Sequence, residues 1–159
     1  MRKVGLEKLR HSLPTSWFIS AGVVALSGAV LPFLISPNMD DFARTATLAS
    51  TLPQGLLSGL VFVAYGLVHM LILQVRPSTA ASVFGFLHLG AALMEQATRT
   101  VAHVLRQQMI METREVDSTA QTMALVHMSA AALFVVSLAF FIIAVSIALR
   151  TRSPIEEAF

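Results

Sequence analysis

The sequence has no cysteine and little charge. Without cysteine, disulfides, thiolate metal sites and thiol redox chemistry are excluded. Asp, Glu, Lys and Arg together make up 13% of the residues, about half of what a soluble protein carries. The formal net charge of +2 is too small to indicate a nucleic-acid partner. A phosphate-binding glycine loop and the zinc motif H-E-x-x-H are also missing, so we do not expect an enzyme of the soluble type.

Apolar residues make up 55% of the chain, and they are clustered. A run of about 18 or more uncharged, apolar residues predicts a transmembrane helix, because lipid offers the backbone no hydrogen bonds. Runs without charge cover residues 17–36, 45–75 and 118–149. We therefore predict an all-α integral membrane protein, a single domain over 1–159 built as an antiparallel bundle of four transmembrane helices. The expected helices cover 17–36, 53–75, 78–110 and 118–150, flanked by a basic segment 1–13 and a polar tail 151–159.

Prolines and caps set the expected helix limits. Pro14 separates the first helix from the basic segment, which we expect to lie on lipid headgroups. An outer loop is expected over 38–52, with Asp40 or Asp41 capping a short interfacial helix and Thr51 capping the second main helix. The last two helices are longer than a bilayer needs, which predicts an extended hairpin that protrudes from the membrane.

One face of the first expected helix is narrow. Ala21, Ala25, Gly28 and Pro32 share this face, which permits close contact with another helix. Proline has no N–H, so Pro32 leaves one helix carbonyl without its usual partner. We expect a neighbouring helix to satisfy that carbonyl.

Basic residues predict the orientation in the membrane. With four crossings both termini lie on one side, and the positive-inside rule places that side in the cytoplasm. The expected localisation is a bacterial-type inner membrane. The expected partners are the lipid bilayer and either other membrane subunits or a second copy of the chain. The cytoplasmic basic residues in this arrangement are Arg2, Lys3, Lys8, Arg10, Arg76, Arg150 and Arg152.

Polar side chains of the third expected helix gather on one face. At about 100° per residue, His88, Glu95, Arg99, His103 and Arg106 fall within an arc of roughly 80°. A charged group facing lipid costs about 2.5–3.5 kcal/mol, so this face is expected to point into the bundle or an aqueous vestibule. Glu95 and Arg99 also have the spacing of an ion pair within one helix, which by itself would account for these two residues.

The second expected helix carries a matching polar face. This face consists of Gln54, Ser58, Tyr65 and His69. Because the connection between the second and third helices is tight, they form an antiparallel hairpin. Its register places Tyr65 level with His88 and Ser58 level with Glu95. We therefore expect the two polar faces to meet.

The leading interpretation is a polar intramembrane pocket for a small ligand or a partner chain. In such a pocket arginine receives a carboxylate, phosphate or quinone oxygen, while glutamate and histidine handle protons or hydrogen bonds. The protein would then be a membrane subunit or binding protein without catalysis of its own. The expected lining is Gln54, Tyr65, His88, Glu95, Arg99, His103, Arg106 and His127.

A second interpretation is a b-type cytochrome. His88 and His103 are about 22 Å apart along one helix at about 1.5 Å per residue, with His69 expected near the first and His127 near the second. This arrangement resembles the general plan of membrane b-type cytochromes, in which histidines of two helices hold each of two stacked haems. The resemblance is one of arrangement, without a family motif. It implies haem b as cofactor and some of His69, His88, His103 and His127 as axial ligands.

Two further alternatives remain open. Thioethers favour Cu(I), and a copper site would draw on the outer-end cluster Met109, Met111, Met123, Met128, His103 and His127. In the other alternative the protein is a scaffold subunit, whose polar face is buried against another chain and binds no ligand.

Overall fold

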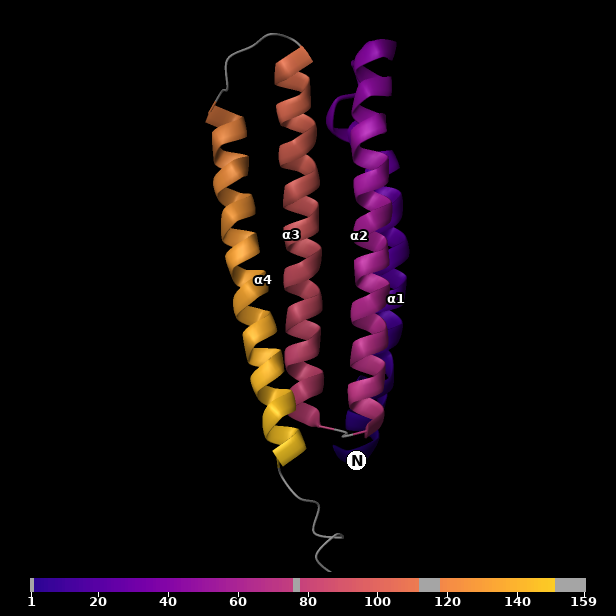
Figure 1. Cartoon of the computed structure of the whole chain (residues 1–159), viewed down its shortest axis with the longest axis vertical. Helices are drawn as coiled ribbons and strands as arrows, with labels where there is room; N and C mark the ends of the chain where they lie inside the picture. The colour runs from indigo at the N-terminus through magenta and orange to yellow at the C-terminus, as the bar shows by residue number, and fades with distance from the viewer. Residues whose placement is uncertain (1, 76–77, 112–117, 151–159) are drawn as a thin grey trace, which may run out of the picture.

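A computed structural model describes residues 2–75, 78–111 and 118–150, with side chains for 11–75, 78–110 and 118–150. Over these residues the protein is all-α, as predicted, with four long helices and no strand. The helices are α1 (Arg2–Ile35), α2 (Asp41–Val75), α3 (Thr79–Met111) and α4 (Ser118–Arg150). They stand side by side along one axis (Figure 1).

Successive helices alternate in direction (Figure 1). The beginning of α1, the connection from α2 to α3 and the end of α4 share one end of the bundle, which we call the terminal end, and the opposite end is the distal end. α1 packs closely along α2, α4 packs closely along α3, and α3 also contacts α1 and α2. In the described part of the chain, α4 has no comparable backbone contact with α1 or α2. Side chains therefore fill the interval between α2 and α4.

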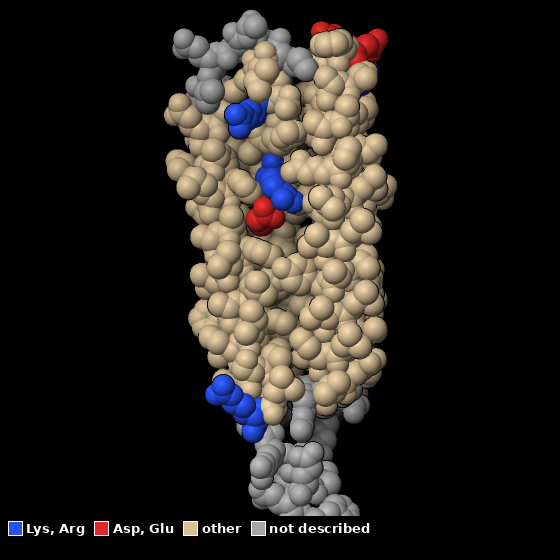
Figure 2. All heavy atoms as spheres, viewed as in Figure 1, with Lys and Arg blue, Asp and Glu red and all other residues tan. Residues whose placement is uncertain are grey.

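Three helices are long and apolar enough to cross a membrane: α2, α4 and residues His11–Ile35 of α1. Their outward faces expose large apolar side chains such as Leu26, Leu57 and Ile143, each more than half exposed. An apolar surface of this extent is characteristic of contact with lipid rather than with water. Figure 2 accordingly shows a face almost free of charge between the two ends, apart from a group halfway along.

Glycines set the close approach of α1 to α2. A Cβ atom on Gly55 would lie 2.9 Å from the carbonyl oxygen of Ala25 and 3.0 Å from Cα of Gly28. A Cβ atom on Gly59 would lie 2.9 Å from the carbonyl oxygen of Ala21. Real Cβ contacts are not this short, so the two backbones meet only because α2 has glycine at both positions. The predicted close contact of the narrow face of α1 is thereby confirmed.

Thr51 satisfies the carbonyl that Pro32 leaves free. In a helix the N–H of residue 32 would bond the carbonyl of Gly28, and proline has no N–H to give. The Thr51 hydroxyl of α2 donates to this oxygen at 2.7 Å instead, in a buried position. The expectation that a neighbouring helix would supply the missing donor is confirmed. Thr51 thus bridges two helices. The prediction that it caps its own helix was wrong, because α2 begins at Asp41.

Two predicted helix limits differ from the structure. α1 starts at Arg2 and continues through Pro14, so the expected break at this proline is not formed. The Ser16 hydroxyl donates to the carbonyl of Ser12 at 2.9 Å, one of the side-chain bonds by which helices near prolines supplement their backbone. α2 starts at Asp41, so most of the expected loop 38–52 is helical. Asp40 caps it as predicted, accepting the N–H of Ala43 at 2.7 Å.

The expected extension of the α3–α4 hairpin beyond the other helices is also not observed. α1 and α2 have 34 and 35 residues, and α3 and α4 have 33 each. The prediction of unequal lengths was wrong because the helices expected over 17–36 and 53–75 are shorter than α1 and α2. Helix α3 begins as predicted, with the N–H of Ala81 donating to Ser78 Oγ at 3.3 Å. The tail 151–159 lies outside the described residues.

Candidate functional site

An aromatic cluster joins all four helices nearer the terminal end. Trp17 of α1 is its centre, and its ring lies 5.2 Å from Phe62 and 5.1 Å from Tyr65 between ring centres. The Trp17 side chain is fully buried. The other members of the cluster are His69, His88, Phe134 and Phe141. This cluster fixes the positions of Tyr65 and Phe134, whose rings form the floor of the cavity above it.

A middle cavity of about 400 Å³ lies among α2, α3 and α4. Its polar wall consists of Ser58, Glu95, Gln96 and Arg99, and its aromatic wall consists of Phe62, Tyr65 and Phe134. Figure 2 shows basic and acidic side chains meeting in a hollow between the helices about halfway along the bundle. The cavity therefore combines a small polar group with a mostly apolar surround, which is typical of small-molecule sites.

Arg99 organises the polar wall. Its Nη2 donates to Ser58 Oγ at 2.8 Å and to Gln96 Oε1, so α3 is bonded to α2 here. Its Nε lies 3.7 Å from Glu95 Oε1, which confirms the predicted pairing within α3 but is too long for a hydrogen bond. The side chain is 37% exposed, and Nη1 makes no hydrogen bond within the described residues. Arg99 thus offers spare donors next to a carboxylate that balances its charge.

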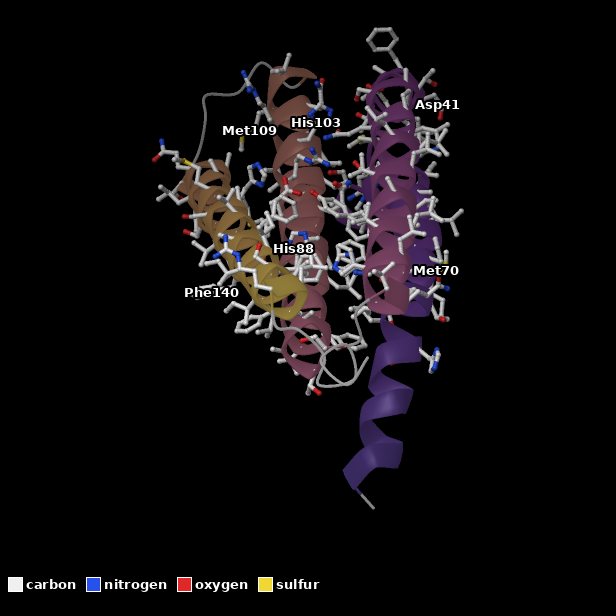
Figure 3. The ribbon with its side chains drawn as sticks, turned by 60° about the horizontal axis from the view of Figure 1, so that its bottom comes forward. Asp41, Met70, His88, His103, Met109 and Phe140 are labelled. Atoms are coloured by element: carbon white, nitrogen blue, oxygen red, sulfur yellow. The ribbon has the colours of Figure 1, made fainter. Side chains whose placement is uncertain are left out.

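An outer cavity of about 640 Å³ lies between α3 and α4 near the distal end. Its lining includes His103, Arg106 and Met109 from α3 and Gln121, His127 and Met128 from α4. Figure 3 shows His103 and Met109 near the distal end of α3, with His88 about halfway toward the other end. His103 and His127 share this cavity, but His127 contacts Thr98 of α3 and His103 contacts Ser50 of α2, so their predicted pairing at one level stays a prediction.

His69, His88, His103 and His127 each have one ring nitrogen held by the backbone, directly or through a hydroxyl. His69 Nδ1 lies 2.7 Å from the carbonyl oxygen of Tyr65. For the other three, the partner is a Ser or Thr oxygen whose own hydrogen goes to a helix carbonyl. The pairs are His88 Nδ1 with Ser137 Oγ at 3.1 Å, His103 Nε2 with Ser50 Oγ at 3.1 Å, and His127 Nδ1 with Thr98 Oγ1 at 3.5 Å.

The Tyr65 carbonyl can only accept, so His69 carries its hydrogen on Nδ1. For the other three, the hydroxyl lies closer to its helix carbonyl than to the imidazole, which favours a hydrogen on the engaged ring nitrogen. The opposite ring nitrogen of each neutral imidazole is then an unprotonated acceptor. The side chains of His103 and His127 line the outer cavity. For His69 and His88, the Nε2 atoms are buried and have no partner.

The inner pair does not leave space for a haem. His69 and His88 have ring centres 6.3 Å apart, so the predicted proximity of the two is confirmed. However, Phe141 stacks on His69 at 4.2 Å, Phe134 lies 4.8 Å from His88, and Trp17 lies within 5.6 Å of both. Neither histidine lines the middle or outer cavity. A macrocycle has no slot between rings packed this closely.

The sequence matches no protein-family model, no curated protein and no solved structure. Only the residues of the site therefore bear on the function.

The residues predicted to form one pocket are divided among several places. Tyr65, Glu95 and Arg99 line the middle cavity. His103, Arg106 and His127 line the outer cavity, and His88 belongs to the aromatic cluster. Gln54 is half-buried and makes no hydrogen bond within the described residues.

The copper alternative rests on residues that the structure only partly brings together. Met109 and Met128 line the outer cavity with the two histidines. The side chain of Met111 lies outside the described residues. Among the described side chains, no group of three or more His, Asp or Glu residues is placed to hold a metal ion.

The sequence reasoning missed the hydroxyl partners of the histidines and the role of Trp17. Ser50 and Ser137 are unremarkable in sequence, since serine is common in transmembrane helices. A usable signal existed, because both lie on helices next to a histidine and at its level. Trp17 gave no such signal, because the loop expected over 38–52 left the register of α1 against α2 open, whereas the structure joins the two helices by the short connection 36–40.

Proposed function

We propose that this protein is a small four-span membrane protein that binds a lipophilic molecule in the middle cavity through a neutral oxygen acceptor. The observation that carries the proposal is the unpaired Nη1 of Arg99 beside an aromatic wall. A quinone has the required chemistry: a carbonyl oxygen to accept from arginine and a flat ring to pack on Tyr65 and Phe134. The protein is then a binding protein or a subunit of a membrane complex.

Charge balance favours a neutral ligand over an anion. Glu95 lies 3.7 Å from Arg99 and is only 20% exposed, so the guanidinium is already neutralised at short range. A carboxylate or phosphate entering the cavity would meet this acid in apolar surroundings, where like charges repel strongly. A carbonyl oxygen gains the arginine hydrogen bonds without that repulsion.

The four-span arrangement supports access to this cavity from the membrane. α3 is less apolar than the other helices, but it is packed between α1, α2 and α4 over its length. Its charged side chains Glu95 and Arg99 face the cavity, which fits a helix that crosses with its neighbours and keeps charge away from lipid. Leu57, Val61 and Val135 of α2 and α4 line the cavity and are exposed, so a lipid-dissolved molecule would reach it between these two helices.

The test uses the single tryptophan of the chain as the reporter. Trp17 lies 5.1 Å from Tyr65, whose ring lines the middle cavity, so a bound quinone will quench its fluorescence. Detergent-purified protein is titrated with a short-chain ubiquinone analogue and, separately, with laurate as an anionic lipid of similar size. We expect saturable quenching by the quinone. Laurate has no group that quenches tryptophan, so its binding is followed by isothermal titration calorimetry, in which we expect none.

Arg99→Lys and Arg106→Lys are the matched variants. Lysine keeps the charge but loses the fork of donors, and a hydrogen bond from a charged group contributes about 1.5–3 kcal/mol. Quinone affinity is therefore expected to fall at least about tenfold in Arg99→Lys and to stay unchanged in Arg106→Lys, which alters the other cavity. Saturable laurate binding without quinone binding would overturn the ligand class. Loss of assembly in Arg99→Lys without any ligand effect would favour the scaffold alternative.

A second candidate function is electron transfer by a haem in the outer cavity. The specific support is that His103 and His127, from two helices, line one cavity together with Arg106. Their free nitrogens, Nδ1 of His103 and Nε2 of His127, would hold the iron, and Arg106 would meet a propionate. A haem held there supplies one-electron chemistry. The test is the absorbance of purified protein before and after dithionite, from cells supplied with haem. A Soret band lost in both His103→Ala and His127→Ala supports this function, and a flat visible spectrum rules it out.

A further inference from the structure

Three buried polar atoms of the aromatic cluster have no hydrogen-bond partner: Trp17 Nε1, His69 Nε2 and His88 Nε2. They come from three different helices, α1, α2 and α3. All three side chains are 0% exposed. Their ring centres form a compact triangle, with separations of 5.1 Å, 5.6 Å and 6.3 Å. An unpaired polar atom in such a position is costly, and three together require a common explanation.

The hydrogen-bonding character of each atom follows from its neighbours. The indole nitrogen of Trp17 is a donor only. His69 carries its hydrogen on Nδ1, because the Tyr65 carbonyl at 2.7 Å can only accept, so its Nε2 is an acceptor. His88 carries its hydrogen on Nδ1 as well, because the hydroxyl of Ser137 already donates to the Phe134 carbonyl at 2.8 Å. The cluster therefore presents one donor and two acceptors.

We propose that these three atoms bind one internal water molecule, which accepts the Trp17 N–H and donates one hydrogen to each histidine. A water molecule has two hydrogens and an accepting oxygen, and buried waters typically make about three hydrogen bonds. Two hydrogen bonds in series through one oxygen join nitrogen atoms up to about 6 Å apart. The three rings, with centres 5.1 Å, 5.6 Å and 6.3 Å apart, are close enough for their nitrogens to lie within this reach.

Two simpler arrangements leave polar atoms unpaired. A direct bond from Trp17 to one histidine satisfies that histidine and leaves the other acceptor alone. A metal ion between the two imidazoles leaves the indole N–H without an acceptor, and the described residues offer no third ligand of the His, Asp or Glu type. One water satisfies all three atoms.

The bound water has a structural and a chemical consequence. It joins α1, α2 and α3 through hydrogen bonds at a level where the remaining contacts are between rings. It also connects His69 to His88 through its own exchangeable hydrogens, beneath the floor of the middle cavity. The site is thus a proton-exchange link between two helices that is closed off from both cavities.

The test is NMR of detergent-solubilised protein labelled with ¹⁵N in histidine and tryptophan. We expect both histidines as neutral imidazoles with the hydrogen on Nδ1, and magnetisation transfer from one long-lived water to the Trp17 indole N–H and to the ring C–H groups of both histidines. A scalar coupling directly between the Trp17 N–H and a histidine nitrogen would overturn the proposal. So would the absence of any water signal at the two histidines.

Two variants and one ion complete the test. Trp17→Phe keeps a ring but removes the only donor, so water transfer to the histidines should fall to less than half. Phe140→Leu changes an exposed ring that stacks on Phe84 and does not contact the three polar atoms, and should leave that transfer unchanged. Silver(I), a redox-inert probe for a two-imidazole metal site, should not shift the ¹⁵N signals of His69 and His88. A stoichiometric shift would show that the two histidines form a metal site and would overturn the proposal of a bound water. If Trp17→Phe does not fold, the measurement on the wild-type protein still decides the proposal.

Discussion

Removing the Thr51 hydroxyl tests whether a bond between helices compensates for Pro32. Thr51→Val preserves the shape of the side chain but leaves the Gly28 carbonyl, now bonded at 2.7 Å, without a donor in a buried position. An unsatisfied buried acceptor costs about 1–3 kcal/mol, and hydrogen bonds between membrane helices have measured up to about 1.7 kcal/mol. We expect Thr51→Val to lower the free energy of unfolding by about 1–2 kcal/mol.

The same substitution is then made in a Pro32→Ala background. Alanine restores the N–H that bonds the Gly28 carbonyl within α1, so Thr51→Val should cost less than about 0.5 kcal/mol there. The coupling free energy is the difference between the costs of Thr51→Val in the two backgrounds, and we expect it to be about 1 kcal/mol. It is measured by unfolding in mixed micelles with increasing SDS, followed by circular dichroism and Trp17 fluorescence. If Thr51→Val lowers the free energy of unfolding equally in the two backgrounds, within about 0.3 kcal/mol, Thr51 does not compensate for the N–H that Pro32 lacks.

Two more predictions concern the packing and the topology of the bundle. Gly55→Ala places a Cβ atom 2.9 Å from the Ala25 carbonyl oxygen, so it should destabilise the protein by about 1–3 kcal/mol in the same assay, whereas Gly22→Ala, with nothing within 4 Å, should not. Gly22→Ala as costly as Gly55→Ala would contradict the close contact of α1 with α2. Because the chain has no cysteine, Ser118→Cys and Thr79→Cys each give one site for a membrane-impermeant maleimide. With four spans, intact cells should label only Ser118→Cys, and labelling of both from the same side would show that α3 does not cross.

Periodicity and one tight turn were enough to predict the meeting of the polar faces of α2 and α3. The turn fixes the register of the hairpin, so Tyr65 lies 5.2 Å from His88 between ring centres, and Arg99 bonds Ser58, as level positions require. The position of α1 could not be predicted in this way. The sequence predicted a loop over 38–52 between the two helices, which left their register open, whereas the structure continues α2 back to Asp41. Trp17 was therefore not predicted to enter the aromatic cluster.

Helix starts were less predictable than helix faces. The segment after Asp41 is rich in threonine and serine, which favour turns when water competes for their hydrogen bonds. In the structure these hydroxyls bond back to the carbonyls of their own helix, as Thr45 does to Asp41 at 2.8 Å, and the helix continues. Composition alone does not distinguish these two outcomes.

The backbone of α4 packs closely along α3 only, and this has a consequence for biosynthesis. A chain is made from its N-terminus, so α1, α2 and α3 leave the ribosome first. The bonds from Thr51 to Gly28, from Arg99 to Ser58 and from His103 to Ser50 lie wholly within these three helices. The bond from His88 to Ser137 needs α4. Translation therefore delivers a three-helix unit with an open polar groove, and the last helix to be inserted adds the wall that turns this groove into two cavities.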